Sequence, residues 1–254
     1  MNSGVKELIL IAQDITSYGK DLGGYNLSRL LYELNSLSGD FWIRLLYLFP
    51  DSIKAELFQA LKDNQKVCHY IDLPLQHSEE RLLRLMRRPE SKAELLNTIN
   101  LIRKELPDVV LRTSFIVGFP TETDEEFESL LDFVREVGFE RLGAFTYSRE
   151  DGTEAYELKG QVPEEIKQER YHRLMTLQAE ISYRKNLELV GKRLRVLVDE
   201  IEDGVAICRY YGQAPEIDGV TFVRGGAEKL KVGEFVDVAV REALDYDLEA
   251  EVAG

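Results

Sequence analysis

The stretch RTSFIVGFPTETDEEF, residues 112–127, joins an apolar segment to a helix start through Gly-Phe-Pro. Its first half is mostly apolar, as in a strand of a parallel sheet whose two faces are both covered. Thr123 is followed three residues later by Glu126, the spacing of a capping box, so the acidic run 124–126 fits the first turn of a helix. Because these carboxylates would repel phosphate, the stretch predicts a strand–turn–helix unit that is not a phosphate-binding loop.

Similar units repeat along the first 150 residues. The strand-like segments are ELILIA (7–12), WIRLLYL (42–48), CHYIDLPL (68–75), VVLRTSFIV (109–117) and RLGAFTY (141–147). The amphipathic helical segments are NLSRLLYELNSL (26–37), DSIKAELFQALKD (51–63), KAELLNTINLIRKEL (92–106) and DEEFESLLDFVREV (124–137). Alternating strands and helices predict an α/β fold with a parallel sheet that curves toward a barrel. Since only five strands are present, we expect an open, partial TIM-type barrel.

The last third of the chain has a different pattern. A long helix is expected to begin at Pro163 and to end at Gly191. Short strands separated by Gly and Asp turns follow: KRLRVLVDE (192–200), GVAICRYY (204–211), GVTFVRG (219–225), EFVDVAVREA (234–243) and YDLEAEVA (246–253). This pattern predicts a small all-β barrel of OB-like size. We therefore expect two domains, residues 1–189 and 190–254.

Composition limits the classes of partner and site. The formal net charge is −14, because 46 acidic residues exceed 32 basic ones, which disfavours non-specific binding to nucleic acid and favours a basic partner. The N-terminal segment lacks signal-peptide features and no apolar run is long enough to span a membrane, so we expect a cytoplasmic protein. Cys68 and Cys208 have neither disulfide-framework nor CxxC spacing, so buried thiols and no metal site are expected.

Charged residues inside the strand-like segments form the first group of candidates. Arg44 and Arg112 interrupt apolar runs, and Asp72 shares one strand face with Gln76. An unpaired buried charge is costly, so these charges need partners. One interpretation is an internal ion-pair network, and the other is a polar barrel interior that binds a charged ligand. The sequence leaves both open.

Residues at the ends of the predicted strands form the second group, because parallel barrels carry their chemistry there. Gly118 indicates either close approach of a ligand to the backbone or a turn that simply requires glycine. Arg87 and Arg88 lie at a predicted helix end, where they either complement the helix dipole or contact an anionic substrate. The remaining acid–base or polar candidates at strand ends are Gln13, Asp14, His77, Tyr147 and Ser148.

Several segments together resemble the radical S-adenosylmethionine (SAM) methylthiotransferases. They are LILIAQDITSYG (8–19), RLLYLFPDSI (44–53), YIDLPLQHSEERLLRLMRR (70–88), RTSFIVGFPTETDEEF (112–127), FTYSREDGTEAYEL (145–158), QVPEEIKQERYHRLMTLQAEIS (161–182) and APEIDGVTFVRG (214–225). The resemblance covers nearly the whole chain and is strongest to the branch that modifies an aspartate of a small-subunit ribosomal protein. It implies that the terminal barrel is a TRAM domain. The tRNA-modifying branch is the nearest alternative, and a non-catalytic protein-binding module is the second.

The family implies cofactors that this chain cannot hold alone. Its members bind 4Fe-4S clusters, one of them on a CxxxCxxC loop after the first barrel strand, and the chain has no such motif. We therefore expect a fragment that begins at the second strand and is inactive alone. The resemblance further implies that a cluster reduces SAM and that the resulting adenosyl radical takes a hydrogen from the substrate before sulfur is inserted.

The family places SAM along the strand ends, which implies a set of contacts in this chain. The expected SAM contacts are Gln13, Asp14, Asp72, Gln76, Arg112, Ser114, Ile116, Gly118, Phe119 and Tyr147. Within this set, Arg112 is the expected partner of the SAM carboxylate, and Ile116 and Phe119 the wall for its adenine. The residues expected to face the substrate are His77, Arg87, Arg88, Arg209 and Tyr210. Catalytic residues are not assigned.

Overall fold

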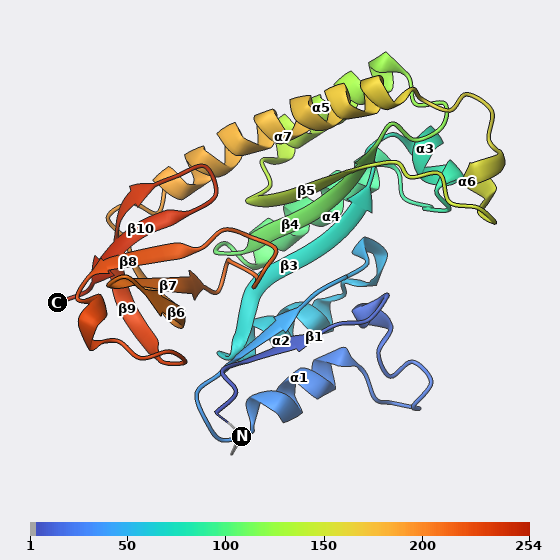
Figure 1. The fold of residues 1–254 in the computed structure, drawn as a ribbon. Helices are drawn as coiled ribbons and strands as arrows, with labels where there is room; N and C mark the ends of the chain where they lie inside the picture. The colour runs from blue at the N-terminus through green and yellow to red at the C-terminus, as the bar shows by residue number, and fades with distance from the viewer. Residues whose placement is uncertain (1–3) are drawn as a thin grey trace.

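The structure, a computed structural model, describes residues 4–254 and contains a parallel sheet with helices, a long helix and a closed barrel (Figure 1). The sheet has the order β1-β2-β3-β4-β5, with every pair parallel. Its strands are β1 (Glu7–Leu10), β2 (Trp42–Leu45), β3 (Val67–Gln76), β4 (Val110–Val117) and β5 (Arg141–Thr146). The expected open α/β arc of five strands is confirmed.

Helices connect the strands of this sheet and follow it. They are α1 (Leu27–Asn35), α2 (Ala55–Asp63), α3 (Glu80–Leu85), α4 (Lys92–Glu105), α5 (Asp124–Val137), α6 (Glu154–Glu157) and α7 (Glu164–Leu187), with 3-10 turns η1 (Ile15–Ser17), η2 (Pro50–Ser52) and η3 (Ala227–Lys229). The expected capping box forms at α5, where Thr123 and Glu126 each accept a hydrogen bond from the other's backbone N–H. None of the helices within residues 4–254 is long and apolar enough to cross a membrane.

The C-terminal strands close into a small barrel, as the sequence predicts. They are β6 (Arg193–Glu202), β7 (Val205–Tyr210), β8 (Thr221–Gly225), β9 (Phe235–Ala243) and β10 (Leu248–Val252), in the order β10-β8-β7-β6-β9. The long helix α7 ends at Leu187 rather than at Gly191. The backbone N–H of Gly191 donates to the carbonyl of Val240 at 2.9 Å, so this residue already belongs to the barrel.

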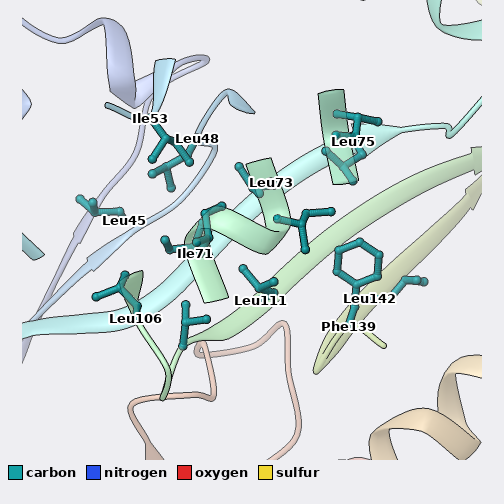
Figure 2. Packing of buried hydrophobic residues seen from close by; sticks show 14 of the residues in the cluster. Leu45, Leu48, Ile53, Ile71, Leu73, Leu75, Leu106, Leu111, Phe139 and Leu142 are labelled. Atoms are coloured by element: carbon teal, nitrogen blue, oxygen red, sulfur yellow. The ribbon is translucent and has the colours of Figure 1, made fainter. Parts of the chain in front are cut away.

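Two large hydrophobic clusters hold the chain together. The first lies between the sheet and its helices and includes Ile71, Leu73, Leu111 and Phe139 (Figure 2). The second fills the barrel and continues into the sheet, where its members are Trp42, Leu46, Cys68, Tyr70 and Val110. The aromatic rings of Trp42 and Phe235 meet edge to face, with centroids 4.8 Å apart, across the two parts of the chain.

The second cluster fixes where the barrel sits. Its sheet residues include Cys68 and Tyr70 near the start of β3 and Val110 at the start of β4. The barrel therefore packs at the amino-terminal ends of these strands, while α3 and α6 lie at the other end of the sheet (Figure 1). The barrel does not cover the carboxyl ends of β3, β4 and β5, so these ends can form a binding site.

Candidate functional site

A cavity of about 1090 Å³ opens at the carboxyl ends of the sheet strands, and we call it the strand-end cavity. Its floor comes from the ends of β3, β4 and β5, and its rim from residues after β2, from the end of α3 and from the segment around α6. The lining residues are Gln13, Tyr47, Phe49, Pro74, Gln76, Leu85, Met86, Arg87, Arg88, Ser114, Ile116, Phe119, Phe145, Thr146, Tyr147, Ser148, Gly152, Thr153, Glu154 and Ala155. Its size and mixed lining suit an organic ligand.

Several residues expected from the sequence meet in this cavity. They are Gln13, Gln76, Ser114, Ile116, Phe119 and Tyr147 from the first set, and Arg87 and Arg88 from the second. Seven others do not line it: Asp14, Asp72, His77, Arg112, Gly118, Arg209 and Tyr210. Sequence reasoning missed Tyr47, Phe49 and Phe145 as lining residues. Phe145 could have been found from the sequence, because it precedes Tyr147 by two positions and so shares its strand face. In the structure Phe145 is 58% exposed.

Three lining residues adopt left-handed backbone conformations without being glycine. Tyr47 has φ 61°, Gln76 has φ 70° and Arg87 has φ 58°. Such conformations cost energy and gather at functional sites. At Arg87 the cause is the end of α3, where the Arg88 N–H donates to the Leu83 carbonyl at 2.8 Å and the Arg87 N–H to the Arg84 carbonyl at 3.0 Å. This is a Schellman ending with arginine at the usual glycine position.

The two arginines that line the cavity, Arg87 and Arg88, differ in their partners. The Arg87 guanidinium pairs with Glu154 of α6, and both side chains are exposed. The Arg88 guanidinium instead lies over the ring of Phe49, 4.2 Å from its centroid, and no carboxylate among the described side chains pairs with it. Such a guanidinium can bind a carboxylate ligand by donating two parallel N–H···O hydrogen bonds. Arg88 is therefore the cation of the cavity best placed to bind an anion.

The structure gives a different reason for Gly118 than ligand approach. Gly118 has φ 71°, and a Cβ there would lie 2.3 Å from Cγ of Lys167, so the stem of this α7 lysine covers the bare backbone. The Lys167 ammonium donates to the Tyr147 carbonyl at 2.9 Å. The turn that requires glycine, the second interpretation from the sequence, is the arrangement present.

His77 and Asp14 also serve local structure. His77 is fully buried, with Nδ1 accepting from the Glu79 N–H at 3.0 Å and Nε2 lying 3.4 Å from the Glu122 carboxylate. Asp14 caps the short turn η1 by accepting from the Thr16 N–H. Burial alone would raise the pKa of Asp14, but hydrogen bonds from Ser17 and Thr16 lower it. Neither side chain faces the strand-end cavity.

Arg112 and Asp72 form an ion pair on adjacent strands, with Nη1 and Oδ1 2.7 Å apart. The Arg112 Nε also lies 3.8 Å from Asp218 of the barrel. Burial alone would lower the pKa of Arg112, but the Asp72 carboxylate raises it. The second Asp72 oxygen accepts from the Tyr47 N–H at 3.0 Å. The internal pair of Arg112 and Asp72 that the sequence left open is therefore present, whereas Arg44, which we also expected to pair internally, pairs with Glu7 instead. The SAM role of Arg112 stays a prediction, and its charge is already paired within the protein.

A second group of buried charges lies in the seam between sheet and barrel. Arg44, 0% exposed, donates to Glu7 at 2.6 Å and to the carbonyls of Tyr211 at 2.7 Å and Gln213 at 3.2 Å. Arg209 lies 2.8 Å from Glu7. These buried contacts tie the loop after β7 to the strands β1 and β2. The loop thereby closes the amino-terminal end of the sheet.

Two residues expected to face the substrate belong to this seam. Arg209 is 5% exposed and also pairs with Asp199 at 2.7 Å, and Tyr210 is 4% exposed with its hydroxyl 3.3 Å from Arg141. Burial alone would lower the pKa of Arg209, but its carboxylate neighbours raise it. Both side chains are occupied inside the protein. Their substrate-facing role is a prediction that this arrangement does not support.

Comparison with known proteins identifies the family. The model of the radical SAM superfamily matches residues 2–134. The chain belongs to the radical SAM superfamily. The TRAM domain model matches residues 190–253 of this radical SAM chain.

Individual relatives share a more specific name. The chain is 54% identical over 249 residues to the ribosomal protein uS12 methylthiotransferase RimO of Thermodesulfovibrio yellowstonii, covering 98% of this chain and 58% of that protein. It is 47% identical to RimO of Thermotoga maritima, covering 98% and 57%. Among solved structures, coproporphyrinogen III oxidase (HemN) from Escherichia coli aligns with a TM-score of 0.49 and 18% identity over 73% of this chain and 49% of that one. The chain thus spans less than three fifths of the curated relatives it matches.

The residues of this radical SAM chain do not fit an iron–sulfur cluster. Cys68 and Cys208 are free and buried, and burial raises the pKa of each thiol to about 12. Among residues 4–254, no group of three or more His, Cys, Asp or Glu could hold a metal ion. A 4Fe-4S cluster needs at least three thiolates, and the described residues hold two thiols, which burial keeps neutral. The expectation that both cysteines are buried is confirmed.

The strand-end cavity does fit SAM. Ile116, Phe119 and Met86 give it an apolar wall, and Arg88 gives it a cation for a carboxylate. The hydroxyl of Tyr147 is buried at this wall without a hydrogen-bond partner.

Proposed function

We propose that the chain is the C-terminal part of a radical SAM methylthiotransferase that attaches a methylthio group to an aspartate of a small-subunit ribosomal protein. The observation that carries the proposal is the identity of about half the residues, over nearly the whole chain, to proteins named uS12 methylthiotransferase. The parent protein would be longer, because those relatives extend well beyond the matched region. Domain boundaries near residue 190 are part of this proposal, supported by the end of α7 at Leu187 and the start of β6 at Arg193.

In this proposal the strand-end cavity holds SAM. When bound, SAM would supply the radical chemistry and would depend on a cluster carried by another part of the parent. The residues of this chain bind and orient it: Arg88 pairs with the carboxylate, and Ile116 and Phe119 pack on the adenine. Gln13, Gln76 and Ser114 are the proposed polar contacts. We prefer Arg88 to Arg112 for the carboxylate, because the Arg112 charge is already paired with Asp72.

A basic protein suits the barrel domain better than RNA. Residues 190–254 contain 8 basic and 14 acidic residues, a balance of 8 minus 14, or −6. RNA recognition needs a basic face with accessible aromatic rings. The segment Arg209, Tyr210 and Tyr211 combines a base with aromatic rings, but Arg209 and Tyr210 are buried in the seam and Tyr211 is partly buried. These observations support a ribosomal-protein partner over tRNA, and a cytoplasmic site of action follows from such a partner.

The test begins with the full coding sequence that contains this chain. The proposal requires a CxxxCxxC motif upstream, and its absence would favour the non-catalytic binding module. The purified parent, with its clusters reconstituted anaerobically, is then incubated with SAM, a sulfur source and either uS12 in small ribosomal subunits or total tRNA. Mass spectrometry should find one methylthio group on an aspartate of the protein. Methylthiolation of tRNA adenosine alone would establish the rival function.

A further inference from the structure

The mouth of the strand-end cavity carries three exposed apolar side chains from separate elements. Tyr47 after β2 is 39% exposed, Leu85 at the end of α3 is 38% exposed and Phe145 in β5 is 58% exposed, and all three line the cavity. Apolar side chains exposed together beside a cavity are typical of an interaction site. We call these three side chains the mouth patch.

Two aromatic residues of the mouth patch flank the floor of the cavity. Tyr47 follows β2 and Phe145 lies in β5, so the ends of β3 and β4 separate them in the sheet. Phe145 is in register with Ile116, the residue proposed for the adenine wall. Among the described strands β5 is the last of the sheet, and Phe145 stands at this open side. A molecule that arrives at the edge of the sheet therefore meets Phe145 before it reaches the cavity floor.

The cavity has room for more than a cofactor. Sites for one small ligand measure about 300–1,000 Å³. The strand-end cavity, at about 1090 Å³, lies above that range. The proposed SAM contacts include Arg88, Ile116 and Phe119 but neither Tyr47 nor Phe145. The two aromatic residues of the mouth patch are thus available to a second molecule.

The rim beside Phe145 carries free negative charge. Glu150 and Asp151 directly precede the rim residues 152–155, and both are exposed. Glu154 pairs with Arg87, whereas Glu150 and Asp151 have no basic partner among the described residues. Free carboxylates attract Lys and Arg side chains and repel phosphate groups. Exposed aromatic rings can bind either apolar side chains or bases, and these charges favour a basic polypeptide over RNA.

We infer that Phe145 and Tyr47 form a docking surface for an extended segment of a basic protein, whose modified side chain enters the strand-end cavity between them. The inference rests on the proposed function, because that function supplies a basic ribosomal protein as the substrate. The barrel packs at the amino-terminal ends of the strands, so a partner bound there needs a second contact at the cavity end. Phe145, the more exposed of the two, is the anchor of that contact.

Binding of uS12 to the 254-residue chain tests the anchor. Isothermal titration calorimetry gives the affinity at low and moderate salt, and calorimetric unfolding gives the thermal midpoint of each variant. The anchor variant is Phe145→Ala. Its control is Tyr183→Ala, which removes an exposed aromatic ring of α7 outside the cavity.

A pair of charge variants tests the acidic rim. Glu150→Lys/Asp151→Lys reverses the two free carboxylates beside Phe145. Asp132→Lys/Glu136→Lys on α5 is the control, because both residues are exposed and the change in net charge is the same. A difference between the two double variants therefore reports the position of the charges and not their number.

Phe145→Ala should weaken uS12 binding by about tenfold, the effect of losing one aromatic anchor. Its thermal midpoint should stay near that of the unaltered chain, because the residue is exposed. Glu150→Lys/Asp151→Lys should weaken binding by about threefold to tenfold at low salt and by less at moderate salt. Both controls should keep the affinity of the unaltered chain.

Three results would overturn the inference while the proposed function still stood on methylthiolation of uS12 by the parent. The first is equal uS12 affinity of Phe145→Ala and the unaltered chain. The second is loss of tRNA binding, with uS12 binding unchanged, which would assign the ring to base stacking. The third is a dimeric unaltered chain that Phe145→Ala makes monomeric in sedimentation, with uS12 binding unchanged, which would assign the mouth patch to a second copy of the chain. Failure of the parent to modify uS12 would remove the proposed function and the inference together.

Discussion

Arg112 and Asp72 pair at 2.7 Å in the interior of the sheet, and a carboxylate from the distant barrel domain joins them. The charge of Arg112 is therefore used within the protein. Arg112→Met should leave Asp72 buried without its partner and lower the free energy of unfolding by about 3–5 kcal/mol. Affinity for S-adenosylhomocysteine should hardly change. Chemical denaturation and calorimetry measure the two quantities.

The matched control for this variant is Arg135→Met, because Arg135 pairs with Asp132 on the exposed face of α5. An exposed pair contributes about 0–1 kcal/mol, so the control should remain near the unaltered stability. A stable Arg112→Met protein with tenfold weaker ligand binding would restore Arg112 as the carboxylate ligand expected from the sequence.

Substitution of Glu7 in the seam between sheet and barrel should destabilise the fold as much as Arg112→Met does. One Glu7 oxygen accepts from Arg44 at 2.6 Å and the other lies 2.8 Å from Arg209, so one carboxylate serves two buried arginines. Glu7→Gln should lower the free energy of unfolding by about 3–5 kcal/mol. Asp132→Asn is the exposed control. Equal stability of the two variants would mean that water or another carboxylate replaces Glu7 as the partner of Arg44 and Arg209.

Alkaline pH should destabilise the fold through its thiols. Burial raises the pKa of Cys68 to about 12, so the folded state keeps this thiol neutral at pH values where the unfolded chain ionises. The stabilising contribution is fully present below about pH 9 and is lost as pH rises toward 12. Each such group changes stability by up to about 1.4 kcal/mol per pH unit in that window. Urea unfolding at several alkaline pH values should show this slope, and Cys68→Val should reduce it. An unchanged slope would assign the effect to other groups whose pKa burial raises, such as Cys208, Tyr70 and Tyr210.

Anaerobic reconstitution with iron and sulfide should leave this chain without a cluster. Its two cysteines are buried, whereas a 4Fe-4S site needs at least three reachable thiolates. Iron and sulfide analysis should give no stoichiometric content, with the absorbance spectrum unchanged. About four irons per chain, with visible charge-transfer absorbance, would reveal a ligand set that neither the sequence nor the structure contains.

The barrel domain should bind a basic ribosomal protein in a salt-sensitive way. Glu200 and Glu202 are neighbours on the barrel surface, and repulsion from Glu202 raises the pKa of Glu200. Reversing both to lysine should weaken binding of uS12 severalfold at low salt, because opposite charges accelerate and stabilise encounter. The same reversal at Glu164 and Glu165 of α7 is the control. Binding of tRNA without binding of uS12 would favour the tRNA alternative.

The sequence predicted the strands well because each is an apolar run bounded by turn residues or by an amphipathic helix. Eight of the residues predicted for the site line the cavity, and Ser114 and Ile116 among them were predicted from the family resemblance. The sequence favoured Arg112 over Arg88 for the carboxylate. The preference changed because Arg112 pairs with Asp72, a contact set by the register of β3 against β4. The α6 segment was missed because its four residues are too few to show a helical period.

The hydrophobic cluster that crosses from the barrel into β2, β3 and β4 affects how the chain unfolds. Trp42, Tyr70 and Val110 share that cluster with the barrel strands. The hydrophobic core therefore continues across the domain boundary near residue 190. Removing the barrel would expose apolar surface on the sheet and leave Arg44 without its carbonyl partners. We therefore expect a single cooperative transition in calorimetry, and aggregation of any piece cut near residue 190. In energetic terms, we expect the sheet and the barrel to act as one folding unit.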